Sequence, residues 1–460
     1  MSLPDEIDIS SLSAVYASGS ATPTTIVRAL HARVLEYSHS NPHVWIDVVP
    51  LEDLLRRAQQ VEAAYVGRDK PRLYGVPFSV KNNIDIGTYR TTAGCEAFTY
   101  YPEASAPVVQ RCLEAGAILL GTTNMEQFAT GLTGCRSPYG TPLCHLDHSY
   151  CAGGSSSGSA VSVSARLVTF SIGTDTAGSI RVPAALNGVV GFKPTYGTVS
   201  KRGVVPAVKT LDCVGTLTRT VRDAQTVWDV IKGYDELDLY SRRIETICQP
   251  ARWGMSKVLR FGVPPPNLLA RLSTEYIQSW TKTMEEVTAR GLQQSSAFDY
   301  GAFEDANGMV YGSSLVAQRL SSFDEFLAKH GTSSLHPAIR TIFETTPQYT
   351  AIDVFKDLDR VAELRRRAEL EFRDKIDVLI VPSTAKHSRI SEVEADPFGT
   401  NKTLGSFSQF VNVLDLCAIS IPVDRWSSQG GHKMSFGITL IAEAGMDAEL
   451  LELAGKLALR

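Results

Sequence analysis

Residues 153–183 are rich in glycine, serine and threonine, and their pattern indicates a site for hydroxyl chemistry. Two Gly/Ser-rich segments, 153–159 and 173–179, flank a short apolar run at 168–172 that predicts a buried strand. Glycines let backbone amides approach a ligand closely, and serines supply hydroxyl groups. The stretch therefore predicts a serine nucleophile beside a backbone site for an anion.

Three side chains are candidates for this chemistry. Ser179 ends a segment whose amides could converge on an oxyanion, although the same pattern suits a turn with a capping serine. Ser155 follows two glycines, and the missing Walker lysine after Gly158 argues against a phosphate loop. Lys81 ends an apolar segment at 75–81. Most lysines are solvated, but burial there would favour a neutral amine that can act as a base.

A second group of polar residues lies at Cys144, His145, His148 and Cys151. The residue types would suit zinc, but their spacing matches no common zinc framework, and the surrounding prolines and glycine are typical of a loop. None of the nine histidines lies in a recognisable Ser-His-Asp motif. We therefore expect neither a metal nor a cofactor.

The elements that must position these residues alternate along the chain. Helical spacing of apolar residues predicts helices at 22–37, 51–65, 107–115, 274–290 and 447–459. Apolar runs predict strands at 44–49, 117–120, 168–172, 214–217, 259–263, 377–381, 418–423 and 435–441. Thr220 is typical of a helix cap. The alternation predicts an α/β protein with a covered sheet, and the absence of a linker favours one large domain.

Composition limits the possible partners. The 460 residues are enough for a large core, and a formal net charge of −4 argues against nucleic acid or an anionic membrane as partner. The acidic N-terminus does not resemble a secretory signal, and no apolar run reaches the roughly 20 residues of a membrane helix. Eight cysteines without a CxxC pair are typical of reduced thiols. We therefore expect a cytoplasmic protein.

Together these motifs resemble the amidase signature family. The similarity runs from about residue 20 to the C-terminus and rests on segments 80–84, 123–128, 153–158, 173–183 and 191–195. The resemblance implies a single α/β/α layered domain, 1–460, around a large, mixed, twisted sheet. Its expected portions are an N-terminal helical part (about 1–70), a signature core (about 71–225), a substrate-side helical part (about 265–375) and closing strands and helix (about 376–460).

The family uses a Ser–cis-Ser–Lys triad. The resemblance implies that Ser179 is the nucleophile, that Ser155 bridges from a cis peptide, and that Lys81 is the base. It further implies an oxyanion hole made by the amides of Thr176, Ala177, Gly178 and Ser179. The acyl group on the serine would then be released by water.

A narrower resemblance, to the allophanate hydrolase subfamily, rests on segments 130–140, 203–214 and 311–319. It implies that Tyr311, Arg319 and Gly131 bind a small amide carboxylate, above all allophanate, whose cleavage releases ammonia in urea degradation. Tyr311 and Arg319 are eight residues apart, which predicts that they share one face of a single helix. The forked guanidinium of an arginine suits a carboxylate. The relatives are commonly homodimers and carry a further C-terminal domain, so this chain is either part of a longer protein or a stand-alone amidase.

Other functions stay open. Ile180, after the nucleophile, is the commoner residue in general small-amide amidases. A different class is the A-type subunit of a glutamine-dependent tRNA amidotransferase, which works inside a complex. A catalytically silent binding protein is disfavoured by the intact set of Lys81, Ser155 and Ser179. Arg166 stands where glycine is frequent, and the sequence offers no reason for it.

Overall fold

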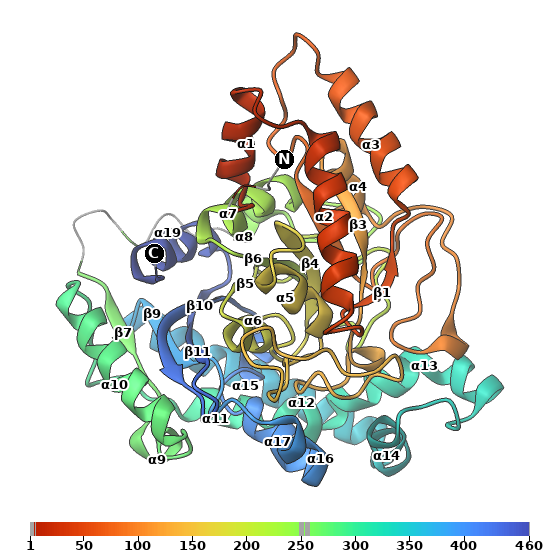
Figure 1. Cartoon of the computed structure of the whole chain (residues 1–460). Coiled ribbons are helices and arrows are strands. Elements are labelled where there is room, and N and C mark those ends of the chain that lie inside the picture. The colour runs from red at the N-terminus through yellow and green to blue at the C-terminus, as the bar shows by residue number, and fades with distance from the viewer. Residues whose placement is uncertain (1–3, 5, 248–252, 254–257, 460) are drawn as a thin grey trace.

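One mixed sheet runs through the part of the chain that the computed structural model describes, residues 4, 6–247, 253 and 258–459 (Figure 1). Its 11 described strands lie in the order β1-β3-β2-β4-β6-β5-β10-β11-β9-β7-β8. They are β1 (Trp45–Val48), β2 (Pro77–Lys81), β3 (Ile118–Thr123), β4 (Phe170–Asp175), β5 (Val190–Lys193), β6 (Cys213–Thr218), β7 (Arg260–Gly262), β8 (Gln293–Gln294), β9 (Val378–Pro382), β10 (Leu416–Ser427) and β11 (Lys433–Glu443). Parallel pairs join β2 to β3 and β4, and β7 to β8 and β9, whereas the remaining pairs are antiparallel.

Helices fill most of the remaining described chain. They are α1 (Ile9–Ala17), α2 (Pro23–Ser38), α3 (Leu51–Ala64), α4 (Pro107–Glu114), α5 (Ser157–Ser164), α6 (Arg181–Asn187), α7 (Val221–Ile231), α8 (Ile244–Ile247), α9 (Pro266–Leu269), α10 (Thr274–Ala289), α11 (Gly301–Asn307), α12 (Met309–Gly312), α13 (Ala317–His330), α14 (Pro337–Thr345), α15 (Ala351–Asp374), α16 (Ile390–Ala395), α17 (Pro397–Leu404), α18 (Phe410–Val413) and α19 (Asp447–Leu457). Short 3-10 turns are η1 (Glu96–Phe98), η2 (Gln127–Ala129) and η3 (Ser314–Val316).

The helices cover both faces of the sheet. Successive residues of a strand point to opposite faces. In β5, a Cβ on Gly191 would lie 2.6 Å from the Cβ of Ala184 in α6, whereas the ring of Phe192 lies 5.9 Å from that of Trp228 in α7. Helix α5 contacts α6, and helices α4 and α19 contact α7. The expected α/β/α layering around a large mixed sheet is therefore confirmed.

Most expected elements form within a few residues of their predicted bounds. The strand expected at 168–172 is shifted, because β4 begins at Phe170 and pairs with β6 as far as Asp175 and Cys213. The strand expected at 418–423 is longer than predicted, because β11 pairs with β10 along the whole hairpin. Thr220 caps α7 as expected, since its side chain accepts from the amide of Asp223 at 3.0 Å.

The single helix expected to carry Tyr311 and Arg319 does not form. Helix α12 ends at Gly312, Ser313 has an extended backbone (φ −136°, ψ 177°), and η3 leads into α13. The hydroxyl of Ser313 donates to the carbonyl of Met309 at 2.7 Å. Such bonds from serine to the backbone compete with a continuing helix. The two residues therefore lie on different helices.

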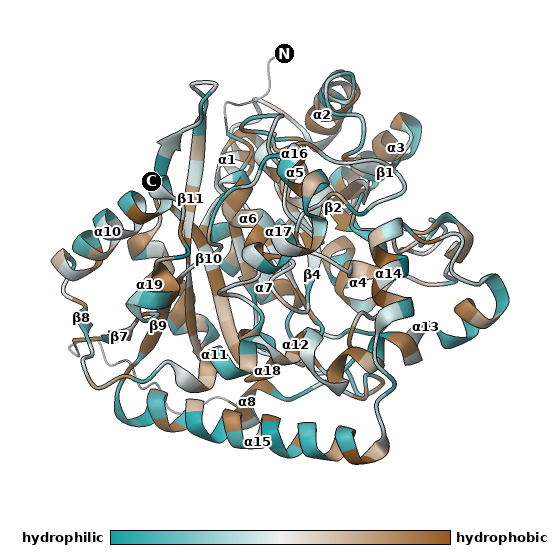
Figure 2. Cartoon of the chain, turned by 90° about the horizontal axis from the view of Figure 1, so that it is seen from below, coloured by the Kyte–Doolittle hydropathy of each residue, from teal (hydrophilic) through white to brown (hydrophobic). Residues whose placement is uncertain are grey.

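The surface and interior differ as in a globular protein. Figure 2 shows brown, hydrophobic lengths of β10 and β11 inside the molecule, and a mostly teal, hydrophilic α15 along one edge. Among the described residues, no helix is long and apolar enough to cross a bilayer.

Candidate active site

The turn that carries Ser179 connects β4 to α6 and folds around one carboxylate. Asp175 accepts from the amides of Gly178 at 2.9 Å and Ile180 at 3.1 Å. Both of its oxygens also bind Arg181, at 2.8 and 3.0 Å, and neither side chain of this ion pair is exposed. Burial would raise the pKa of Asp175, but the charge and hydrogen bonds of Arg181 lower it to about 2. This buried carboxylate holds Ser179 in place.

The same turn leaves several amides free. Among the described residues, the amides of Thr176, Ala177 and Ser179 have no acceptor. The amide of Gly178 was expected to be an oxyanion donor, but it donates to the carboxylate of Asp175 and is not free. Gly178 has a φ of 121°, and a Cβ there would lie 2.5 Å from the hydroxyl of Ser408. The turn therefore requires glycine at this position and offers three amides to an anion.

Lys81 ends β2 and is fully buried, as the sequence predicted. Its Nζ lies 2.7 Å from the Oγ of Ser155 and 2.8 Å from the Oγ1 of Thr174. Burial lowers the pKa of Lys81 to about 7, although nearby carboxylates, those of Asp175 and Asp212 foremost, act in the opposite direction. An amine with this pKa is largely uncharged in mild alkali and can accept a proton.

The two Gly/Ser segments meet at this lysine. The peptide bond between Gly154 and Ser155 is cis. The amide of Ser156 donates to the carbonyl of Ser179 at 3.2 Å, and its hydroxyl donates to the carbonyl of Thr174 at 3.2 Å. The structure thus brings together the lysine, the cis peptide and the turn that the sequence singled out separately.

Glu126 is a functional candidate to which the sequence assigned no role. It is fully buried, and its Oε1 accepts from the hydroxyl of Thr133 at 2.7 Å and the amide of Gly134 at 2.9 Å. Its Oε2 has no hydrogen-bond partner among the residues that the structure describes. A Cβ on Gly131 or Gly154 would lie 2.4 or 2.5 Å from this oxygen. Burial raises the pKa of Glu126. The available signal was its place in segment 123–128, one of the motifs on which the family resemblance rests.

Glu126 also ties two loops together. Its amide donates to the carbonyl of Ser155 at 3.2 Å, and the amide of Gly154 donates to the carbonyl of Leu132 at 2.9 Å. Gly131, with a φ of 147°, begins this loop. The carboxylate therefore sets the Gly131 loop against the segment that contains Ser155.

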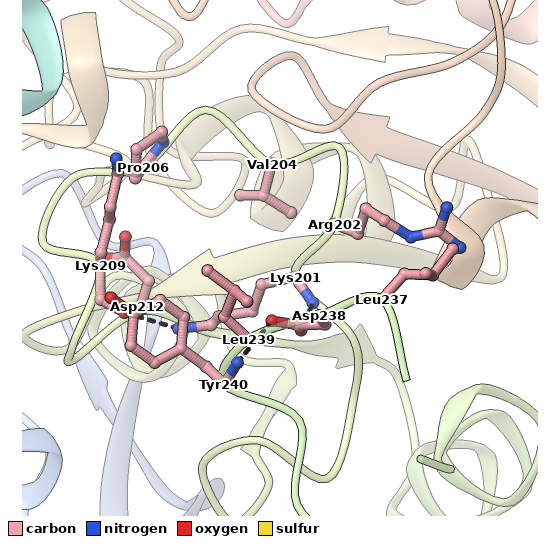
Figure 3. Close-up of a pocket in the computed structure, with 10 residues that line it drawn as sticks. All are labelled: Lys201, Arg202, Val204, Pro206, Lys209, Asp212, Leu237, Asp238, Leu239 and Tyr240. Carbon is pink, nitrogen blue, oxygen red and sulfur yellow. Dashed lines mark hydrogen bonds between the residues drawn. The ribbon is translucent and has the colours of Figure 1, made fainter. Parts of the chain in front are cut away.

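Asp212 supports the nucleophile turn from another side. Its carboxylate accepts from the hydroxyl of Thr176 at 2.5 Å and from the amide of Val208 at 3.1 Å. Asp212 also lines a cavity of about 280 Å³ (Figure 3). In this cavity the amine of Lys201 donates to the carbonyl of Lys209 at 2.6 Å, and burial lowers its pKa. These contacts fix the loop from which Asp212 reaches Thr176.

Arg319 is a buried cation with free donors. Its side chain is buried, and within the described residues its Nε and Nη1 have no hydrogen-bond partner. Its Cζ lies 5.6 Å from the ring centre of Tyr311, so the two residues contact each other across the helix break. The neighbouring Gln318 accepts from the amide of Thr210 at 3.2 Å, two residues before Asp212. The loop that carries Asp212 thus contacts the start of α13, the helix that also contains Arg319.

The four residues that suggested a metal do not converge. The Sγ of Cys144 donates to a carbonyl in α6 at 3.5 Å, and the ring of His145 lies 3.2 Å from the hydroxyl of Tyr37. His148 is exposed, whereas Cys151 is buried. No three His, Cys, Asp or Glu side chains in the described chain are placed to hold a metal ion.

The structure explains Arg166, which follows the end of α5. Its φ of 56° is a left-handed conformation that favours glycine. The guanidinium binds the carboxylate of Glu6 at 2.5 Å, and the carbonyl accepts from Arg33 at 3.1 Å. The ion pair with Glu6 therefore gives the arginine side chain a role at a strained position, and the contact of the carbonyl helps to hold the backbone there.

The layered fold and the buried serine–lysine site are those of an amidase-signature protein. The sequence profile of the Amidase family matches residues 26–451, and the chain belongs to this family. It is an amidase-signature hydrolase closely related to allophanate hydrolase.

Three relatives illustrate the similarity. Urea amidolyase of Saccharomyces cerevisiae is 36% identical over 417 residues, which are 90% of this chain but 22% of that protein. The A-type subunit of the glutamyl-tRNA(Gln) amidotransferase of Deinococcus deserti is 32% identical over 470 residues, 97% of this chain and 95% of that protein. The solved structure of Kluyveromyces lactis allophanate hydrolase superposes with a TM-score of 0.87 and 34% identity, covering 98% of this chain and 72% of that chain. The match thus spans about a fifth of the first relative's length.

Proposed function

We propose that this chain hydrolyses allophanate and releases ammonia through an acyl-enzyme on Ser179. The observation that carries the proposal is the 2.7 Å contact between the Nζ of Lys81 and the Oγ of Ser155, in a site where burial lowers the pKa of the amine to about 7. The names of the relatives, urea amidolyase and allophanate hydrolase, support the choice of substrate.

In the proposed reaction, the Oγ of Ser179 attacks the amide carbon while its proton passes through Ser155 to Lys81. The tetrahedral oxyanion accepts from the free amides of the turn, those of Thr176, Ala177 and Ser179. The carbon–nitrogen bond then breaks, the proton returns through Ser155 to the nitrogen, and ammonia leaves. Water attacks the resulting ester along the same proton path and frees the serine.

Arg319 and Tyr311 support a substrate that carries a carboxylate. A buried donor without a partner costs about 1–3 kcal/mol, and two atoms of the arginine have no partner in the described structure. A carboxylate can accept two parallel hydrogen bonds from a guanidinium. Tyr311 lies against the same group and can add a hydroxyl contact. We propose that Gly131, whose loop Glu126 holds beside Ser155, lines the same substrate site.

A second candidate is the A-type subunit of a glutamine-dependent tRNA amidotransferase. The full-length match to the Deinococcus deserti protein favours it. Such a protein would take glutamine as the ammonia donor and depend on partner chains. A general small-amide amidase would act alone and prefer neutral amides.

Ammonia release by the purified chain distinguishes these functions. We expect rapid release from allophanate, slow release from malonamide as a neutral amide of similar size, and none from glutamine. Efficient release from glutamine, or equal rates on allophanate and malonamide, would reject the proposed substrate. Dialysis against a metal chelator should leave the rate unchanged, since the mechanism uses no metal or cofactor.

We further propose a cytoplasmic homodimer that acts in urea degradation, as the resemblance implies. Light scattering should then give twice the 50.0 kDa mass of the chain. A monomeric mass would remove the dimer from the proposal without affecting the chemistry.

A further inference from the structure

A cavity of about 1130 Å³ lies apart from the serine–lysine site. Its walls come from α2, the C-terminal ends of α5 and α6, the N-terminal end of α7, and the β10–β11 hairpin. None of the residues placed in the candidate active site lines this cavity. It is therefore a separate feature of the fold.

The cavity is strongly cationic in a chain whose net charge is −4. Its lining includes six basic side chains, Arg33, Arg166, Arg219, Arg222, Arg425 and Lys433, against two acidic ones. Both acids are engaged. Glu6 binds Arg166 at 2.5 Å and Arg219 at 3.1 Å, and Asp8 caps α1. Arg222 and Arg425 form no ion pair with a carboxylate among the described residues.

Neutral donors also line the cavity. Helix α7 has 11 residues, and the amides of Val221 and Arg222 at its N-terminus have no acceptor in the described chain. Asp223, the acid in this first turn, does not accept from these two amides. Its carboxylate accepts from the amide of Ile9 at 3.1 Å. The hydroxyl of Ser435, a residue of β11 that also lines the cavity, is buried, and the residue is 4% exposed. Within the described part of the chain, this hydroxyl has no hydrogen-bond partner.

We propose that this cavity binds a small polyanion, a molecule with two or more phosphate or carboxylate groups. One anionic group would lie at the N-terminus of α7, where free amides and the positive end of the helix dipole favour negative charge. Arg222 and Arg425 would neutralise the ligand, and Ser435 would donate its unused hydroxyl. A polyanion suits the site better than a single small anion, because the cations come from separate elements around a large volume.

Calorimetric titration of the full chain with tripolyphosphate and with citrate tests the proposal. The buffer keeps ionic strength constant with sodium chloride, because electrostatic binding is screened by salt. We expect saturable binding of at least one of the two probes. The double substitution Arg222→Ala/Arg425→Ala should weaken it at least tenfold, and Ser435→Ala should weaken it by a smaller factor.

The matched control is Arg366→Ala/Arg373→Ala, which removes two exposed arginines from α15, outside the cavity. This control should bind like the unmodified chain. Equal weakening in the two double variants would mean that the polyanion binds the surface at large and would overturn the proposal. Absence of saturable binding to both probes at millimolar concentration would overturn it as well. The titration uses no substrate, so its outcome is independent of the proposed hydrolysis.

Discussion

Arg181 and Asp175 form a fully buried ion pair across the turn that carries Ser179. The guanidinium also donates to the carbonyl of Ser408 and to the side chain of Asn412, each at 2.9 Å. Two desolvated charges are stable together only when further hydrogen bonds satisfy them, and here the surrounding chain supplies these bonds. The position of the nucleophile therefore depends on a charge pair as well as on the glycine of the turn.

Arg181→Met should lower the free energy of unfolding by about 3–5 kcal/mol, because it leaves the charge of Asp175 buried without its partner. Urea denaturation measures this change. The control Arg366→Met breaks an exposed pair on α15 and should cost less than about 1 kcal/mol. Equal effects in the two variants would contradict the structural role of the pair.

Ser179→Ala should reduce ammonia release on the order of 10⁴-fold or more, because it deletes the attacking hydroxyl. Its urea midpoint should stay close to that of the unmodified chain. Ser164→Ala, a buried serine at the far end of α5, is the control and should retain most activity. Residual activity above a few per cent in Ser179→Ala, together with none in Ser155→Ala, would show that the serine roles are wrongly assigned.

The value of kcat/KM should rise with pH through about 7 and stay high in mild alkali. The pKa of Lys81 is lowered by burial, and the amine accepts a proton only in its neutral form, which predominates above that pKa. The apparent value belongs to the coupled unit of Lys81, Ser155 and Ser179. Lys81→Met should remove both the rate and this acidic limb. An unchanged pH profile in this variant would exclude the lysine as the base.

Glu126→Gln should move the acidic limb of the pH profile of kcat/KM to lower pH. The negative charge of Glu126 raises the pKa of Lys81, so its removal lowers that pKa and frees the amine at lower pH. Glutamine keeps an oxygen that can accept from Thr133 and Gly134, and the fold should persist. Glu126→Ala leaves those donors unsatisfied and should cost about 1–3 kcal/mol of stability as well. A lower rate in Glu126→Gln without a shift of the acidic limb would mean that Glu126 contributes through packing and that its charge does not act on Lys81.

Local chemistry explains what the sequence could predict. Gly178 has a backbone conformation that only glycine adopts easily, so a glycine–serine motif predicts its own turn. Lys81 ends an apolar strand, and its burial follows from that neighbourhood. The amidase-signature fold could be predicted from the sequence because these motifs are local and specific.

The remaining features depend on contacts between distant segments. The break between Tyr311 and Arg319 depends on whether Ser313 bonds to the carbonyl of Met309 or leaves the helix intact, and spacing alone does not decide this. The role of Glu126 depends on loops that meet only in the folded chain. The cationic cavity brings together basic side chains separated by up to 400 positions, Arg33 and Lys433, which no local pattern predicts.

Arg319→Ala should lower kcat/KM for allophanate by about 10²-fold or more, because two charge-assisted hydrogen bonds to the carboxylate are lost. The rate on malonamide, which has no carboxylate, should change much less. The break between α12 and α13 does not weaken this expectation. The Cζ of Arg319 still lies 5.6 Å from the ring centre of Tyr311, and two of its donor atoms have no partner among the described residues. Competition between the two amides in one reaction measures the difference directly.

Arg319→Lys is the matched variant, because it keeps the positive charge and removes the planar fork. It should restore only part of the lost rate on allophanate, since an ammonium cannot form the two parallel bonds. Tyr311→Phe removes one hydroxyl from the same site and should have a smaller effect than either arginine variant. Equal losses on allophanate and malonamide in Arg319→Ala would mean that this buried arginine supports the fold and does not recognise a carboxylate. The urea midpoint of Arg319→Ala would then fall together with the rate, whereas a binding role leaves it largely unchanged.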